Sequence, residues 1–373
     1  MTALTVWRIL CAVGFAMIKQ LFTSMLAATL MGSGSTLAGT GVRYGSGNPP
    51  YIVYGSFDDK GLAAGGSVLI YEEENSLYTQ IEKAYGGYCS GMDGEIITDG
   101  NTVVMTGGNA GKIVGGCAEM SDLSRVCHNK VIVAGGTVET IYGGIAQGSK
   151  YKGIVQGNEI VVTGGSIGTI YAASLGAPED TRCAENSVSL MGKGASYSFE
   201  SQVFDGGAIS IEKVALLEES ASHVSDNALN ITGTDIQIGK VSGHFQQLNF
   251  HLLEGQLSST DPMVTITGDI FDIVPDMKLS FDAVEGMTWK PGDSITLIEA
   301  QKGLSIAMWA IEYNIYQNGN PEKILATAQL DFEQGQGTTR FLKLVITSAI
   351  PEPTTGTLSL LALAALAARR RRK

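Results

Sequence analysis

Four cysteines in the body of the chain are spaced in a way that could support oxidative cross-linking. Cys89 and Cys117 are separated by one unit of an internal repeat, and Cys127 and Cys183 by two units. Cys89 and Cys117 should therefore lie on neighbouring strands, ~4.8 Å apart, within the Cα range of a disulfide. We predict a Cys89–Cys117 disulfide, with Cys117–Cys127 across one loop as the competing pair.

Metal binding and acid–base catalysis would need other groups of side chains. There is no Cys-x-x-Cys pair and His128 stands alone, so neither a metal site nor a cofactor is expected. Glycan cleavage needs carboxylates brought together as acid and base. No acidic column forms when the repeats are aligned: Glu139 aligns with two glycines, and Glu159 with a threonine and a lysine. We expect no catalytic residues and no enzyme; the alternative is a carbohydrate-active β-helix enzyme, a polysaccharide lyase or glycosidase.

These residues lie on an internal repeat within residues 84–204. An asparagine opens each of four similar segments at an almost constant spacing, and a second motif ending in two small residues keeps the same period. Units this short cannot bury their own apolar face, so neighbours must stack on one another. The asparagine segments are Asn101–Gly108, Asn129–Gly136, Asn158–Gly165 and Asn186–Lys193, and the second motif is Ala84–Gly87, Ile113–Gly116, Ile141–Gly144 and Ile170–Ala173.

Each unit is expected to contain two short β-strands closed by small-residue turns. The sequence therefore predicts an all-β fold, a parallel β-helix (β-solenoid) with 28–29-residue rungs. Residues 39–83 are expected to form a linker and an N-terminal cap. The glycine doublets stop after Asp205, and residues 205–349 are predicted to be a less regular β region, either degenerate rungs or a sandwich-like cap.

Alternation along the first strand assigns its side chains to two faces. Val104, Ile132 and Val161 are expected to point outward as an apolar row. Either a loop or the C-terminal half covers this row, because monomers rarely leave wide apolar patches open, or the row is a docking surface. The rows on either side of it should point into the coil. These inward residues are Val103, Met105, Val131, Val133, Ile160, Val162, Val188 and Leu190.

A tyrosine row is expected on the outward face of the second strand. Tyr85, Tyr142 and Tyr171 occupy equivalent positions in three units. Such a row can stack on sugars, but stacked aromatic rings also stabilise neighbouring strands without any ligand. We consider it a candidate ligand face.

The N-terminal segment up to Ala38 has the pattern of an export signal. Lys19 precedes an apolar run over residues 21–30, and small residues follow up to Ala38. This order predicts a signal peptide cleaved after Ala38. Met17 is an alternative start, and an uncut membrane anchor is the alternative interpretation.

The C-terminal residues 350–373 contain three parts in order. Pro351, Glu352 and Pro353 come first, an apolar stretch over residues 354–368 follows, and a basic cluster ends the chain. This order resembles the PEP-CTERM sorting signal of exported Gram-negative proteins. The resemblance implies recognition of the Pro-Glu-Pro element by an exosortase-type processing enzyme and membrane attachment through a transmembrane helix; an ordinary tail anchor is the alternative. The stop would be Arg369, Arg370, Arg371 and Arg372.

The net charge and the order of the regions along the chain limit the classes of function and partner. The formal net charge of −12 argues against nucleic acid and anionic membrane surfaces as partners. A Gly-rich repeat followed by a less regular β region is similar to autotransporter-type or adhesin-like passenger proteins. The resemblances imply a protein of the cell envelope or cell surface, membrane-associated at least before processing. It would act in adhesion, matrix association or envelope structure, with a glycan or a surface protein as partner.

Overall fold

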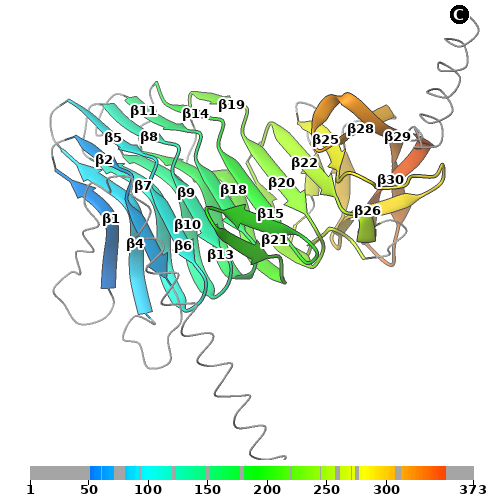
Figure 1. Cartoon of the computed structure of the whole chain (residues 1–373), viewed down its shortest axis with the longest axis horizontal. Helices are drawn as coiled ribbons and strands as arrows, with labels where there is room; N and C mark the ends of the chain where they lie inside the picture. Colours follow the sequence, from blue (N-terminus) through cyan, green and yellow to red (C-terminus); the bar gives the residue numbers. More distant parts are fainter. Residues whose placement is uncertain are drawn as a thin grey trace, which may run out of the picture. The chain divides into compact units, whose positions relative to one another are not determined.

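Nearly all the described residues of the computed structural model lie in β-strands and the turns that join them (Figure 1). They belong to one compact unit, residues 40–373. Apart from one 3-10 turn at Glu254–Gln256, these residues form no helix. The structure describes residues 51–59, 61–70, 80–91, 94–119, 123–147, 152–176, 180–218, 221–243, 245–256, 261–269, 271–273, 277–306 and 312–349.

Several predicted features lie outside the described residues. They are the signal peptide with its cleavage site at Ala38 and the sorting signal with its apolar segment at residues 350–373. Within the described segments, no helix has the length and apolar character needed to cross a bilayer.

Parallel pairing builds the stack from three columns of strands, here called the first, second and third ladders. The first two belong to one large sheet, and the third is a separate six-stranded sheet. In a regular unit, β8 (Leu123–Cys127) of the third ladder leads into β9 (Lys130–Val133) of the second and then β10 (Thr137–Gln147) of the first. Each strand pairs in parallel with its counterparts in the units before and after. The sequence predicted two strands per unit, but each regular unit has three. The strands of the third ladder were missed because they are short and carry polar residues, which obscure the alternation of apolar and polar side chains.

The other strands of the ladders follow the same parallel pairing. The first ladder also holds β1 (Tyr51–Asp58), β4 (Gln80–Ser90), β7 (Asn109–Glu119), β13 (Gly165–Leu175), β18 (Ile209–Leu217), β21 (Ile236–Ser242), β23 (Val264–Ile266) and β26 (Ser294–Ala300). The second also holds β3 (Ser67–Ile70), β6 (Thr102–Met105), β12 (Glu159–Val162), β15 (Ser187–Met191), β20 (Ala228–Thr232), β22 (Gln247–Leu252), β25 (Lys278–Ala283) and β28 (Glu312–Gln317). The third also holds β2 (Leu62–Ala64), β5 (Glu95–Asp99), β11 (Lys152–Gln156), β14 (Arg182–Ala184) and β19 (His223–Ser225).

The parallel stack extends past both ends of the predicted repeat region, residues 84–204. At the start, β1 pairs in parallel with β4, so strands of the stack occupy part of the expected N-terminal cap. After residue 205, parallel pairing continues as far as β28. The chain then reverses, and β29 (Asn320–Gln334) and β30 (Arg340–Ala349) pair antiparallel with each other and with β28 and β26.

The interior of the stack is apolar, as the alternation predicted. The eight residues expected to point inward are all fully buried in one core cluster. Neighbouring units add equivalent side chains in register, such as Ile113, Ile141 and Ile170 of the first ladder. Full burial of each such side chain stabilises the fold by ~1.5–3 kcal/mol, but only when the next unit is present to cover it.

The outward apolar row is covered by a hairpin inserted between β15 and β18. Val104, Ile132 and Val161 are 4 %, 0 % and 0 % exposed. They cluster with Phe204 and with other aromatic residues of β16 (Ser196–Phe199) and β17 (Gln202–Asp205), which pair antiparallel. The row is therefore covered as expected, but by this hairpin and not by the C-terminal half of the chain.

Candidate functional site

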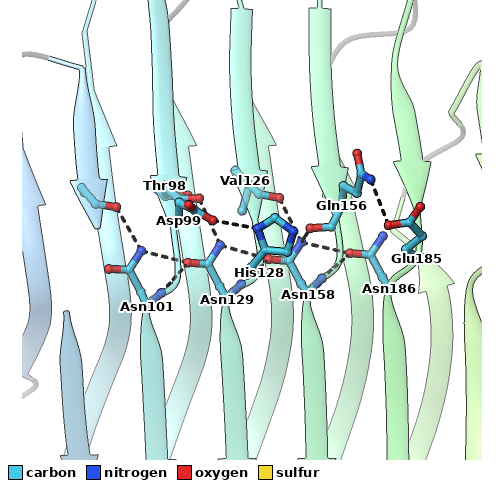
Figure 2. Close-up of polar contacts among 11 residues, drawn as sticks. Thr98, Asp99, Asn101, Val126, His128, Asn129, Gln156, Asn158, Glu185 and Asn186 are labelled. Atoms are coloured by element: carbon cyan, nitrogen blue, oxygen red, sulfur yellow. Dashed lines mark hydrogen bonds and ion pairs between the residues drawn. The ribbon is translucent and has the colours of Figure 1, made fainter. Parts of the chain in front are cut away.

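A column of buried asparagines runs along the inside of the stack, where the third-ladder strands turn into the second ladder (Figure 2). Asn101, Asn129, Asn158 and Asn186 are at most 1 % exposed. The side-chain Nδ2 of each of the first three donates to Oδ1 of the next, at 2.8, 3.0 and 2.9 Å. The residues whose spacing defined the repeat thus form one hydrogen-bonded chain, here called the amide ladder.

Asn129 shows that hydrogen bonding in the amide ladder is complete. Its Nδ2 donates to Oδ1 of Asn158 and to the backbone carbonyl of Thr98, at 3.0 and 3.2 Å. Its Oδ1 accepts from Nδ2 and from the backbone N–H of Asn101, at 2.8 and 3.1 Å. A primary amide has two donors and two acceptor positions, so nothing is left unpaired. An unsatisfied buried polar group costs ~1–3 kcal/mol, so each amide depends on the next.

The ladder is longer than the repeat suggested. Asn186 donates to Oδ1 of Asn227 at 3.0 Å, and Asn227 donates to Oε1 of Gln246 at 3.1 Å. Sequence reasoning missed both residues. Asn227 comes later in the chain than the period predicts, because the β16–β17 hairpin lies between it and Asn186, and Gln246 is a different residue type.

A backbone feature accompanies every asparagine of the ladder, Asn227 included. The residue before each of the five asparagines is in the left-handed region, with φ between 51° and 65°. Glycine adopts this region freely, whereas other residues do so uncommonly. The turn therefore directs the asparagine side chain inward in every unit. These residues are Gly100, His128, Gly157, Glu185 and Asp226.

The second repeated motif packs against the first. A Cβ atom added at Gly116 would lie 2.5 Å from Nδ2 of Asn129 and 2.7 Å from Oγ1 of Thr98. A Cβ atom at Gly87 would likewise collide with the side-chain amide of Asn101. In these two units the second glycine of each pair thus leaves room for the amide ladder, whereas Ala173 carries a Cβ atom at the equivalent position beside Gly144.

The tyrosine row packs against itself on the outer face of the first ladder. Tyr85 and Tyr142 are 7 % and 6 % exposed, and Tyr171 is half-buried. The ring of Tyr85 stacks on Tyr54 with centroids 5.3 Å apart, and Tyr142 stacks on Tyr171 at 5.2 Å. Val114 lies between the two pairs in the same column. The rings therefore bridge consecutive strands.

Polar contacts fix Tyr142 further. The ammonium of Lys112 lies 4.4 Å from the centre of its ring, and its hydroxyl donates to Glu218 at 3.0 Å. Burial, and then the Glu218 carboxylate, raises the pKa of Tyr142 above its usual value. The buried rings of Tyr85 and Tyr142 leave no open face on which a sugar could stack. This corrects the expectation of a ligand-binding tyrosine row, in which Tyr171 alone keeps partial exposure.

The predicted Cys89–Cys117 disulfide is wrong. Between β4 and β7, paired residues are one position further apart in the sequence than the two cysteines are. Cys89 therefore pairs with Ala118, and Cys117 pairs with Tyr88. Successive side chains of a strand point to opposite faces, so Cys89 joins the interior cluster and Cys117 the outer tyrosine cluster. The competing pair is not formed either, because all four described cysteines are free thiols.

Burial makes these thiols unreactive. All four are buried, and burial raises the pKa of Cys183 to about 12. Burial, followed by the nearby Glu119 carboxylate, also holds the pKa of Cys117 well above its usual value. Since the thiolate is the reactive form, these residues are packing groups.

A polar groove of about 330 Å³ opens beside the hairpin, at the turns around β15, β20 and β21. Lys193, Asp235, Gln237 and Asp261 line it and are exposed. Elsewhere in the described segments, no three or more His, Cys, Asp or Glu side chains come together as a metal site would require. Comparison with models of known protein families finds no match, and searches of curated proteins and of solved structures find none either.

Proposed function

We propose that this chain is an exported, envelope-sorted surface protein and that its stack is a β-solenoid with regular 28–29-residue rungs. The amide ladder is the observation that carries the proposal. It joins successive rungs through fully paired buried amides, in addition to the backbone bonds of three ladders. Such a body suits a rigid scaffold outside the cell, in adhesion, matrix association or envelope structure.

The chain ends support export, and the burial of the thiols is compatible with it. Free cysteines in an oxidising compartment are liable to cross-link, and here all four described thiols are buried. The signal-peptide pattern ending at Ala38 and the Pro-Glu-Pro signal with its basic end give the route. Processing by an exosortase-type enzyme would follow membrane attachment through residues 350–373.

Expression of the whole chain in Gram-negative cells that contain an exosortase tests this proposal. The wild-type protein should lose its C-terminal tail and become accessible to protease or antibody on intact cells. The triple variant Pro351→Ala, Glu352→Ala and Pro353→Ala should stay uncleaved at the membrane. Replacing Pro321 and Glu322, an exposed Pro-Glu pair within β29, should change nothing. Uncleaved wild-type protein in the cytoplasm would contradict the proposal.

A second candidate function is carbohydrate cleavage, and the polar groove favours it because Asp235 and Asp261 both line it. Two carboxylates beside one cavity are the minimum for acid–base cleavage of a glycan. Incubating the purified protein with glycans and measuring both retention and new chain ends separates the two functions. Retention without new chain ends supports adhesion, and new chain ends support the enzyme.

A further inference from the structure

The polar groove has walls that the backbone holds in place. Lys193 and Thr234 exchange two backbone hydrogen bonds, at 2.8 and 3.1 Å. The carbonyl of Asp235 accepts from the N–H of Ile209 at 3.0 Å, and the buried side chain of Gln256 donates to the carbonyl of Gly233 at 2.9 Å. The side chains that line the groove are therefore presented from fixed positions, which lowers the entropy lost when a ligand binds.

The groove side chains come from adjacent strands and turns. Gln237 of β21 and Thr265 of β23 are direct neighbours in the parallel register and point outward. Asp235 lies at the turn before β21, in the left-handed region with φ of 64°. Together with Lys193 and Asp261 they surround a space at the lower end of the ~300–1,000 Å³ range of small-molecule sites.

The charges of the groove indicate the class of ligand. The carboxylates of Asp235 and Asp261 oppose an anion, and the ammonium of Lys193 offsets part of their attraction for a cation. An apolar ligand would find only Ile236 and Pro262 among the lining residues. A neutral polyol fits, because each of its hydroxyls both donates to a carboxylate and accepts from an ammonium or amide.

We infer that this groove binds a neutral saccharide, the end or a short stretch of a glycan chain. The inference rests on the proposed surface function and gives it a ligand class. The acidic protein repels acidic polymers as a whole, which also favours neutral glycans. Asp235 and Asp261 would accept hydrogen bonds from sugar hydroxyls, while Lys193 and Gln237 would donate.

Calorimetric titration of the whole chain in detergent with three hexasaccharides tests the inference. The probes are a β-1,4-linked glucose hexamer, an N-acetylglucosamine hexamer and a galacturonate hexamer. At least one neutral hexamer should bind, and more tightly than the galacturonate hexamer. Asp235→Asn should weaken that binding by about tenfold or more, the loss expected for one hydrogen bond to a charged group.

Asp226→Asn is a matched control. Asp226 is also exposed, also in the left-handed region (φ 57°), and belongs to the same unit, but it does not line the groove. Both substitutions remove one charge, and asparagine tolerates the left-handed backbone. Asp226→Asn should bind like the wild type, and Gln237→Ala should bind more weakly.

Three outcomes would overturn the inference. These are no binding of either neutral hexamer, preferential binding of the galacturonate hexamer, or binding that Asp235→Asn and Gln237→Ala leave unchanged. The proposed function is tested independently, because surface exposure on intact cells does not depend on the groove. Surface exposure without hexamer binding would remove this inference alone, whereas cytoplasmic retention with hexamer binding would remove the proposed function alone.

Discussion

The units from Asn101 to Asn227 and the units after Gln246 fill the same kind of interior in different ways. The first region combines small and β-branched residues with the buried amide ladder. The second has no described asparagine column and instead buries large side chains. Phe250 and Phe281 stack in consecutive units with centroids 5.7 Å apart. Both interiors are buried, but only the first is held together by the side-chain hydrogen bonds of the amide ladder.

The spacing of the chain reflects this difference. Along the second ladder, the register advances from Thr102 to Lys130 and from Lys130 to Glu159 in two nearly equal steps. After the ladder ends the step is longer from Asn249 to Ser280, and longer again from Phe281 to Ile315. Hydrogen bonds weaken steeply when distance or angle changes, whereas apolar packing is non-directional. The period is regular from Asn101 to Asn186. The inserted hairpin interrupts it before Asn227 without breaking the amide ladder, and the steps past Gln246 lengthen where apolar packing fills the interior.

Removing one amide should give the largest effect. Asn158→Ala takes away the acceptor of Asn129 and the donor to Asn186, and leaves the carbonyl of Val126 unpaired. We expect a loss of about 4 kcal/mol or more in the free energy of unfolding, since each orphaned buried group costs ~1–3 kcal/mol. Chemical denaturation with coincident probes measures it.

The matched control is an asparagine of β20 whose side chain lies on the outer face of the stack. Asn230 also forms a chain with its neighbours, donating to Ser189 and accepting from Asn249, but it is half-buried on the outer face. Water can replace these bonds, so Asn230→Ala should cost less than about 1 kcal/mol. In the second region, Phe250→Leu should cost only about 1–2 kcal/mol, because an apolar core adapts to shape. Equal costs at Asn158 and Asn230 would break the comparison.

A methyl group added next to the amide ladder should cause the second-largest loss of stability. Gly116→Ala forces the Cβ atom against Asn129 and should cost about 2–3 kcal/mol, as overpacking does. At Gly207 an added Cβ would meet nothing nearer than 3.7 Å, so Gly207→Ala should be close to neutral. Thermal unfolding of the two variants, run side by side, decides. Tolerance at Gly116 would mean that the glycine pairs have another purpose.

The covering hairpin belongs to the first region and should contribute less than the ladder. Phe204→Ala uncovers the row Val104, Ile132 and Val161 and should cost about 2 kcal/mol, the value of burying one such side chain. It should also raise binding of a hydrophobic dye. Val203, the residue before Phe204, is 64 % exposed. The free energy of unfolding of Val203→Ala should therefore stay within ~0.5 kcal/mol of the wild-type value. If Phe204→Ala were equally mild, the hairpin would not be what protects the apolar row.

The last prediction concerns alkaline pH alone, where the buried Cys183 thiol should affect stability. The folded pKa of Cys183 is raised to about 12 from an ordinary value near 9, so the unfolded chain releases this proton first. The neutral thiol's contribution is complete below pH 9 and is lost as the pH rises toward 12. In the wild type, the free energy of unfolding should fall as the pH rises through that window. In Cys183→Ala this fall should be less steep, and below pH 8 the pH dependence of the two proteins should be the same. An identical alkaline slope in both proteins would show that the thiol does not titrate differently on folding.

Much of the fold could be predicted because the period is strict. The inward rows, such as Val131 and Val133, and the covered outward row around Ile132 follow from alternation along β9. The end of the stack could not be predicted, since apolar filling after Gln246 imposes no spacing. The disulfide failed for a related reason: a difference of a single residue in the register moves Cys89 and Cys117 to opposite faces.

The candidate site was only partly visible in the sequence. The asparagines were found by their spacing, but their burial could not be inferred without the third strand of each unit, which turns them inward. The groove could not be found at all, because Lys193, Asp235 and Asp261 are far apart in the chain and meet only through the register of β20, β21 and β23. The predicted export and sorting signals, by contrast, are contiguous motifs and remain predictions from the sequence.

Hydrogen exchange read residue by residue in wild type and Asn158→Ala tests the central claim most directly. The backbone N–H of Asn129 donates to Oδ1 of Asn158 at 3.0 Å. If the amide ladder holds the regular units in register, exchange should accelerate at Asn129 and along β9 and β12, while β22 and β25 keep their wild-type protection. Acceleration that is equal in both regions, or absent at Asn129, would contradict the claim.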